Sequence, residues 1–145
     1  MIERGLTTRL PWAWLIAHGH KTLELRSKPT GFRGAAAVRA SKVAVDYHWA
    51  QYVRERRPDV RLPSDRELAD LAGCILGIGY VVGCCPIASR DLSDITSRAC
   101  LDPRDYPGLE FAWEWRDVRP LRRPLIHDIP SGAVVWFRVP DDLEL

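Results

Sequence analysis

Three charged side chains within six residues, Lys21, Glu24 and Arg26, are the group in this sequence best suited to chemistry. If residues 22–27 form a strand, Glu24 and Arg26 share one face with Thr22, and their Cβ atoms lie about 7 Å apart. At that spacing the Glu24 carboxylate can orient the Arg26 guanidinium, which leaves the Lys21 ammonium for a ligand. The alternative is an ordinary solvated strand face, where an ion pair contributes only about 0–1 kcal/mol.

The neighbouring sequence predicts the elements that position these charges. Residues 5–10 alternate loosely between apolar and polar side chains and predict a first strand. Pro11 is suited to the start of a short helix, and Gly19 is suited to its end. Leu23 and Leu25 then alternate with the polar residues, as in a half-buried strand. A helix that ends directly before this strand would bring the three charged side chains together at one rim of the fold.

The rest of the chain predicts a mixture of short strands and helices. Ser41 is expected to cap a helix that buries Val45 and Trp49, and Ser64 with Glu67 has the spacing of a capping box. Residues 88–108 are turn-rich and give no clear assignment. Further strands are expected over residues 35–40, 74–87, 109–116 and 133–139. The predicted fold class is therefore α+β, a compact mixed barrel of five to six strands with two to four flanking helices.

Composition indicates one globular domain over residues 1–145, with 46% hydrophobic and 28% charged residues. Residues 1–60 carry 11 Lys and Arg against 5 Asp and Glu, whereas residues 61–145 carry 10 against 14. The first half therefore holds the excess of positive charge. The start of the chain lacks the pattern of a secretory signal, and the longest apolar run is too short to cross a bilayer. We expect a cytoplasmic protein that does not bind membranes.

The four cysteines and four histidines do not predict a metal site or a cofactor. The cysteines have no paired C-x-x-C spacing, so buried thiols in a reducing compartment are the simpler expectation. His18 and His20 could bind a metal near the motif, but the sequence offers no third ligand. We expect polar surface roles for the histidines, with His20 retained as a possible proton-transfer group.

The sequence contains the motif Gly19-x-Lys21-x-x-Glu24-x-Arg26. It is preceded by Pro11-Trp12-Ala13-Trp14-Leu15-Ile16 and followed by Phe32-Arg33-Gly34, Ala40-Ser41-Lys42, Phe111-Ala112-Trp113-Glu114 and Gly132-Ala133-Val134-Val135-Trp136. Together these segments resemble the ASCH domain family, whose signature is G-x-K-x-x-E-x-R. The likeness covers nearly the whole chain, and residues 11–42 are its most specific part. It implies a PUA-like barrel with a cleft lined by the motif and a role in binding RNA or another nucleic acid.

Some ASCH-type proteins are hydrolases, including ribonucleases and amidohydrolases that act on an acylated cytidine. The resemblance then implies that Lys21 belongs to the catalytic apparatus, with Glu24 and Arg26 as cleft partners. The amidohydrolase branch pairs its lysine with a carboxylate from a later central strand, and residues 74–82 contain no Asp or Glu. Thr22 could serve as a nucleophile only if a base reaches it.

Binding requires fewer special features than catalysis. Cationic and hydroxyl side chains could contact phosphates, and a tryptophan could stack on an unpaired base for about 1–3 kcal/mol. Trp12 is the better core candidate of the two tryptophans near the motif, because it shares a helix face with Leu15 and Ile16. The expected nucleic-acid-binding residues are Lys21, Glu24, Arg26, Lys28, Arg33, Arg39, Ser41, Lys42, Trp12 and Trp14.

Three functions follow from the sequence. The first is a module that binds RNA or single-stranded nucleic acid, and the second is a hydrolase that uses Lys21. The third is a protein-interaction domain in transcriptional regulation, for which the acidic tail over residues 141–144 could be a contact or only a solubilising end. Salt-sensitive binding would distinguish the first function, and turnover would distinguish the second.

Overall fold

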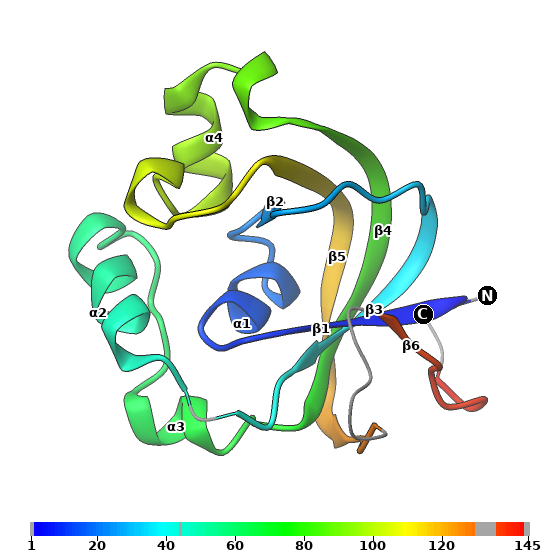
Figure 1. The fold of residues 1–145 in the computed structure, drawn as a ribbon. Coiled ribbons are helices and arrows are strands. Elements are labelled where there is room, and N and C mark those ends of the chain that lie inside the picture. Colours follow the sequence, from blue (N-terminus) through cyan, green and yellow to red (C-terminus); the bar gives the residue numbers. More distant parts are fainter. Residues whose placement is uncertain (1, 44, 130–135, 144–145) are drawn as a thin grey trace.

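A computed structural model describes all residues except 1, 44, 130–135 and 144–145 (Figure 1). One curled sheet of six strands forms its centre, in the order β2-β5-β4-β3-β1-β6. β1 and β3 pair in parallel, and the other neighbours are antiparallel. The strands are β1 (Arg4–Thr8), β2 (Leu23–Arg26), β3 (Gly34–Ala40), β4 (Cys74–Pro86), β5 (Phe111–Ile126) and β6 (Trp136–Phe137). This confirms the expected α+β fold with a barrel-like sheet.

The short helix α1 (Trp12–Ala17) lies in the hollow of the curled sheet (Figure 1). Leu15, Ile16 and Ala17 are fully buried there. A Cβ added to Gly77 of β4 would lie only 2.9 Å from the Ala17 Cβ, so a glycine at position 77 allows the helix and the sheet to approach closely. α1 therefore fills the barrel interior and fixes the start of the loop that leads to the motif.

Three further helices surround the sheet, namely α2 (Tyr47–Arg56), α3 (Asp65–Ala69) and α4 (Leu92–Ala99). α3 begins with the predicted capping box, because the Ser64 hydroxyl accepts from the Glu67 amide and the Glu67 carboxylate accepts from the Ser64 amide. α4 lies in the segment that the sequence left unassigned, and the Asp91 carboxylate caps it by accepting from the Asp94 amide. None of the helices among the described residues combines the length and apolarity that a bilayer crossing requires.

The prediction that Ser41 caps the second helix is wrong. α2 begins only at Tyr47, after Asp46. The Ser41 amide instead donates to the Thr8 carbonyl, and the Ser41 hydroxyl accepts from the Val43 amide. Ser41 thus follows the end of β3 and takes part in a local turn. The helical spacing of the apolar residues begins later in the chain.

The prolines at positions 120 and 124 predict that the strand over residues 109–116 continues at an edge or bend, and this is confirmed. β5 continues through Pro120 and Pro124 to Ile126. Proline is tolerated there because β2 pairs only with residues 111–114, so the rest of β5 lies on the edge of the sheet. Of the final predicted strand, residues 133–135 lie outside the described residues, and β6 contains Trp136 and Phe137.

Candidate functional site

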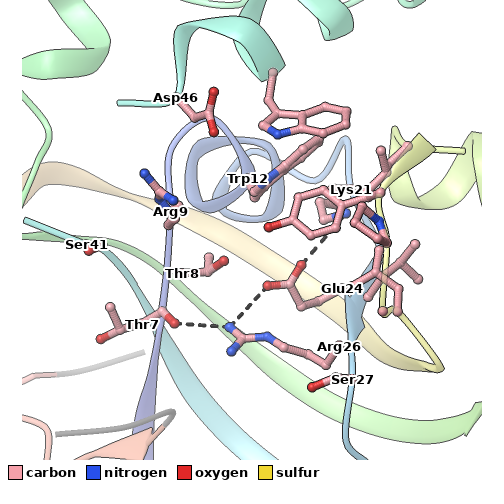
Figure 2. A pocket seen from close by; sticks show the side chains of 17 residues that line it. Thr7, Thr8, Arg9, Trp12, Lys21, Glu24, Arg26, Ser27, Ser41 and Asp46 are labelled. Atoms are coloured by element: carbon pink, nitrogen blue, oxygen red, sulfur yellow. Dashed lines mark hydrogen bonds and ion pairs between the residues drawn. The ribbon is translucent and has the colours of Figure 1, made fainter. Parts of the chain in front are cut away.

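A cavity of about 490 Å³ opens between β1, β2, α1, the start of α2 and the segment that precedes β5 (Figure 2). Its size is suited to one small organic molecule. All three residues of the G-x-K-x-x-E-x-R motif with charged side chains line this cavity. The lining consists of Thr7, Thr8, Arg9, Trp12, Lys21, Glu24, Leu25, Arg26, Ser27, Ser41, Asp46, Trp49, Leu101, Tyr106, Pro107, Gly108 and Leu109.

Lys21 lies at the inner end of the motif and is only 1% exposed. Its Nζ donates to the Ala99 carbonyl at 2.5 Å, lies 3.8 Å from Glu24 Oε1 and stands 4.8 Å from the centre of the Trp12 ring. Burial lowers the pKa of Lys21, and the nearby Glu24 carboxylate opposes that shift. The amine therefore loses its proton more readily than an exposed lysine does.

Glu24 joins the two cations of the motif. Its Oε2 accepts from Arg26 Nη2 at 3.2 Å, and the same Nη2 donates to the Thr7 carbonyl at 3.0 Å (Figure 2). Glu24 is 4% exposed, whereas the Arg26 side chain is 22% exposed at the cavity wall. The prediction that Glu24 orients Arg26 is confirmed by this ion pair.

The local backbone explains why the motif converges. Gly19 adopts a positive φ of 78° after α1, and the amides of His20 and Lys21 both donate to the Leu15 carbonyl. This tight helix end turns the chain directly into β2. In β2, Glu24 lies opposite Trp113 of β5, and the Arg26 guanidinium lies 5.4 Å from the centre of the Trp113 ring. Strand alternation then directs both charged side chains to the cavity.

Aromatic side chains form a second part of the wall, and the sequence identified only one of them. The Trp12 and Trp49 ring centroids lie 5.8 Å apart, and those of Trp49 and Tyr106 lie 5.2 Å apart. Trp12 is 8% exposed, so it is mostly core, as expected, although it reaches the cavity. Helical spacing assigned Trp49 to the core, and no pattern marked Tyr106, which follows a short 3-10 turn.

Several hydroxyls and two further charges complete the site. Thr7, Thr8, Ser27 and the expected Ser41 offer hydroxyl groups along the lining. Arg9 and Asp46 lie at the rim, near the start of α2 (Figure 2). The end of β1 and the beginning of α2 come together here only in the folded chain, and no spacing pattern along the sequence indicated this contact.

Two of the expected contact residues, Arg39 and Trp14, do not line the cavity. Arg39 is buried in β3, where its Nε donates to the His127 carbonyl at 2.6 Å. Trp14 is partly buried and stacks on His18, with ring centroids 4.2 Å apart.

The exposed cations Lys28, Arg33 and Lys42 also lie outside the cavity lining. Lys42 pairs with Asp128 at 2.6 Å, and Arg33 Nη1 donates to the carbonyls of the loop that carries it. These three side chains stay on the surface around the strands.

Thr22 lies beside the motif but does not line the cavity. Its hydroxyl accepts from Arg98 Nε at 3.1 Å, and Arg98 also pairs with Glu114 at 2.8 Å. A guanidinium does not act as a base near neutral pH. This arrangement therefore does not activate Thr22 as a nucleophile.

No metal site is evident in the part of the chain that the structure describes, because no three His, Cys, Asp or Glu side chains come together. The four cysteines are free thiols. The cavity lining itself offers amine, carboxylate, guanidinium, hydroxyl and aromatic groups.

No family model matches the chain, and no curated protein matches it significantly. Solved structures do match it. The ASCH protein of Zymomonas mobilis superposes with a TM-score of 0.58 at 15% identity, over 96% of this chain and 88% of that one. This chain has the ASCH fold. Two single-residue variants of the same Zymomonas protein give TM-scores of 0.55 and 0.58 at 16% and 17% identity, covering 96% and 97% of this chain and 89% and 92% of theirs.

The ASCH fold agrees with the resemblance that the motif segments carry. At 15–17% identity the likeness establishes the arrangement of the chain. The ligand of the cavity depends on the side chains that this chain places there.

Proposed function

We propose that this protein binds RNA and that its cavity receives one unpaired nucleotide. The observation that carries the proposal is the meeting of the charged motif and the aromatic wall in one cavity of about 490 Å³. Sequence-specific RNA recognition commonly targets single-stranded segments, whose bases stack on aromatic rings and form hydrogen bonds at their edges.

Arg26 supports the binding of a phosphate or a base edge. Both of its hydrogen bonds with described residues use Nη2, so Nη1 and Nε keep their donors for a ligand. The Glu24 carboxylate and the Thr7 carbonyl hold the guanidinium in place before a ligand arrives. A planar arginine fixed in this way is well suited to two parallel hydrogen bonds with a phosphate.

Trp49 and Tyr106 support the stacking of a base. Both side chains are partly exposed and line the same cavity as the motif. Stacking of a base on an aromatic ring contributes about 1–3 kcal/mol. The hydroxyls of Thr7, Ser27 and Ser41 could in addition bind a ribose 2′-OH, which distinguishes RNA from DNA.

The test is a fluorescence-anisotropy titration of a labelled unstructured 20-nucleotide RNA and of the matching DNA at low salt. We expect Trp49→Ala to weaken RNA binding by roughly 5- to 150-fold, the equivalent of one lost stack. Trp14→Ala is the matched control, because Trp14 lies outside the cavity, and it should bind like the wild type. Circular dichroism melts establish that each variant is folded.

Arg26→Gln should also weaken RNA binding, by roughly tenfold or more, because it removes a charge-assisted contact. Arg61→Gln removes an exposed arginine that does not line the cavity, so it is the control for the change in net charge. The proposal fails if the wild type binds neither RNA nor DNA at low salt, or if folded Trp49→Ala and Arg26→Gln both bind as well as the wild type.

The burial of Lys21 favours a second candidate, hydrolysis of a bond in the bound nucleotide. A lysine whose pKa is lowered by burial can act as a general base or stabilise developing negative charge. Prolonged incubation with oligoribonucleotides and with acylated cytidine, followed by chromatography, tests this candidate. Unchanged substrates would eliminate hydrolysis and leave the binding proposal standing.

A further inference from the structure

The second half of β5 carries four exposed arginines on an open edge of the sheet. They are Arg116, Arg119, Arg122 and Arg123, and together they are called the β5 arginine strip. The only acidic residue between positions 116 and 126 is Asp117, so this segment has a net charge of +3. It is an island of positive charge in the half of the chain that is acidic as a whole.

The strip is poorly neutralised by its surroundings. Arg116 lies 3.9 Å from Glu114, and its side chain is 68% exposed. Arg119, Arg122 and Arg123 form no ion pair with any residue that the structure describes. By contrast, Arg98 lies 2.8 Å from Glu114. Exposed guanidinium groups without acidic partners are available to an anionic ligand.

The packing of β5 leaves these arginines on the surface. Val118 and Leu121 are partly buried and pack against two different clusters of core residues. A Cβ on Gly79 would lie 2.5 Å from Val118 Cγ2, so the Val118 side chain covers the sheet closely. The apolar side chains hold the strand in place, and all four arginines remain exposed.

The edge itself argues against an added protein strand. β2 pairs with β5 only as far as Glu114, so the following part of β5 has β4 as its sole described neighbour. Pro120 and Pro124 interrupt the row of amides that a new strand would need. The arginine side chains, rather than the backbone, are therefore the contact groups of this edge.

The strip is long enough for several phosphates. Seven residue steps separate Arg116 from Arg123, which is about 23 Å at the usual rise of a strand. The cavity cannot supply this kind of contact, because its charged lining is nearly balanced, with Arg9, Lys21 and Arg26 facing Glu24 and Asp46. A polyanion longer than one nucleotide needs a second set of cations.

We propose that the β5 arginine strip binds the sugar–phosphate backbone of an RNA several nucleotides long, which places one nucleotide in the cavity. This inference rests on the proposed function and extends it from a single nucleotide to an oligonucleotide. Glu114 lies opposite Leu23 in the neighbouring strand, and Trp113 lies opposite Glu24. Because Glu114 and Arg116 project from the face of the sheet opposite Trp113, the RNA passes around the open edge of β5.

The closing experiment measures how RNA affinity depends on salt between about 50 and 300 mM, since each phosphate contact with a single strand adds about 0.7 to the magnitude of the slope of log K against log salt. The probe is an unstructured 20-nucleotide RNA. The strip variant is Arg119→Gln with Arg122→Gln. The matched control is Arg61→Gln with Arg66→Gln, which removes two exposed arginines outside β5. A dinucleotide, followed by tryptophan fluorescence, reports on the cavity alone.

We expect the strip variant to lower the magnitude of the slope by about 1.4 and to weaken binding of the 20-nucleotide RNA by roughly tenfold or more at 50 mM salt, with the control near the wild type. Dinucleotide binding should be unchanged by the strip variant and weakened by Trp49→Ala. Equal salt slopes for the strip and control variants would overturn the strip proposal. If Trp49→Ala still weakens binding in that case, the proposed function survives; if no RNA binds the wild type, both proposals fail.

Discussion

Glu24 should be the side chain of the motif on which folding stability depends most. It is 4% exposed and lies between two cations, with Lys21 Nζ 3.8 Å from Oε1 and Arg26 Nη2 3.2 Å from Oε2. Glu24→Gln keeps the shape and removes the negative charge, so it leaves the buried Lys21 ammonium without a counter-charge. Breaking a buried ion pair from one side costs about 3–5 kcal/mol. We expect a value near the lower limit, because the glutamine amide oxygen still accepts from Arg26.

Lys21→Met should cost much less, about 1 kcal/mol. It removes the buried cation, and Glu24 keeps Arg26 as its partner. The main loss is the hydrogen bond to the Ala99 carbonyl. The double variant has no lysine at position 21, so Glu24→Gln no longer leaves a buried ammonium without a counter-charge. We therefore expect a total of about 2 kcal/mol rather than about 4, which is a coupling of about 2 kcal/mol.

Urea unfolding, monitored by circular dichroism, measures these free energies, and thermal melts provide a second readout. A loss of about 3 kcal/mol corresponds to about 10 °C for a chain of this size. The reasoning is refuted if the single variants add within about 0.5 kcal/mol, or if Lys21→Met is as destabilising as Glu24→Gln.

The pH dependence of the same variants gives an independent test. Burial lowers the pKa of Lys21 below its ordinary value of 10.5, and the Glu24 charge raises it. Glu24→Gln therefore lowers the pKa of Lys21 further. Over the interval between the folded and unfolded pKa values, the unfolded chain binds more protons, so stability rises with pH. The loss of unfolding free energy caused by Glu24→Gln should become smaller as the pH rises from 7 towards 10. In the background of Lys21→Met, this dependence on pH should disappear.

Two further predictions concern positions outside the cavity. Gly77→Ala should cost about 1–3 kcal/mol in urea unfolding, because its Cβ would lie 2.8 Å from the Arg119 carbonyl oxygen, whereas Gly31→Ala, with nothing within 4 Å, should stay within about 0.5 kcal/mol. Equal effects would contradict the close approach of β4 to its neighbours. Ser64→Ala should lower the free energy of unfolding by about 1 kcal/mol through loss of the capping box, and an unchanged urea midpoint would show that α3 does not depend on its cap.

The cavity and the β5 arginine strip differ in charge, and each suits a different property: ligand selection for the cavity and salt-dependent affinity for the strip. The cavity combines balanced charges with aromatic rings, so it can select the ligand. Three of the four arginines in the strip have no acidic partner among the described residues, so the strip can supply salt-dependent affinity. If both proposals hold, mutations in the cavity should change which RNA is bound, and mutations in the strip should change how tightly any RNA is bound.

The helices show where local patterns are sufficient and where they are not. The capping box at Ser64 was predicted from two residue types three positions apart, because its hydrogen bonds form within one turn. The same reasoning was wrong at Ser41, where the amide is already bonded to Thr8 of a distant strand. A competing contact from another part of the sheet decided the outcome there.

The sequence by itself determined the convergence of Glu24 and Arg26 and the core position of the leucines between and before them. Strand alternation and a helix end at Gly19 are local properties of the backbone, so residue types and spacing are enough. Only the tertiary structure decided that Lys21 is buried, because its amine contacts Ala99 at the end of α4, 78 residues later.

The tertiary structure also decided that Trp49 and Tyr106 line the same cavity as the motif, and that the arginine-bearing part of β5 has only β4 as a neighbour among the described strands. A pattern along the chain distinguishes an apolar face from a polar one. It does not reveal which distant segment packs on that face, or whether any segment does, because that depends on contacts between residues far apart in sequence.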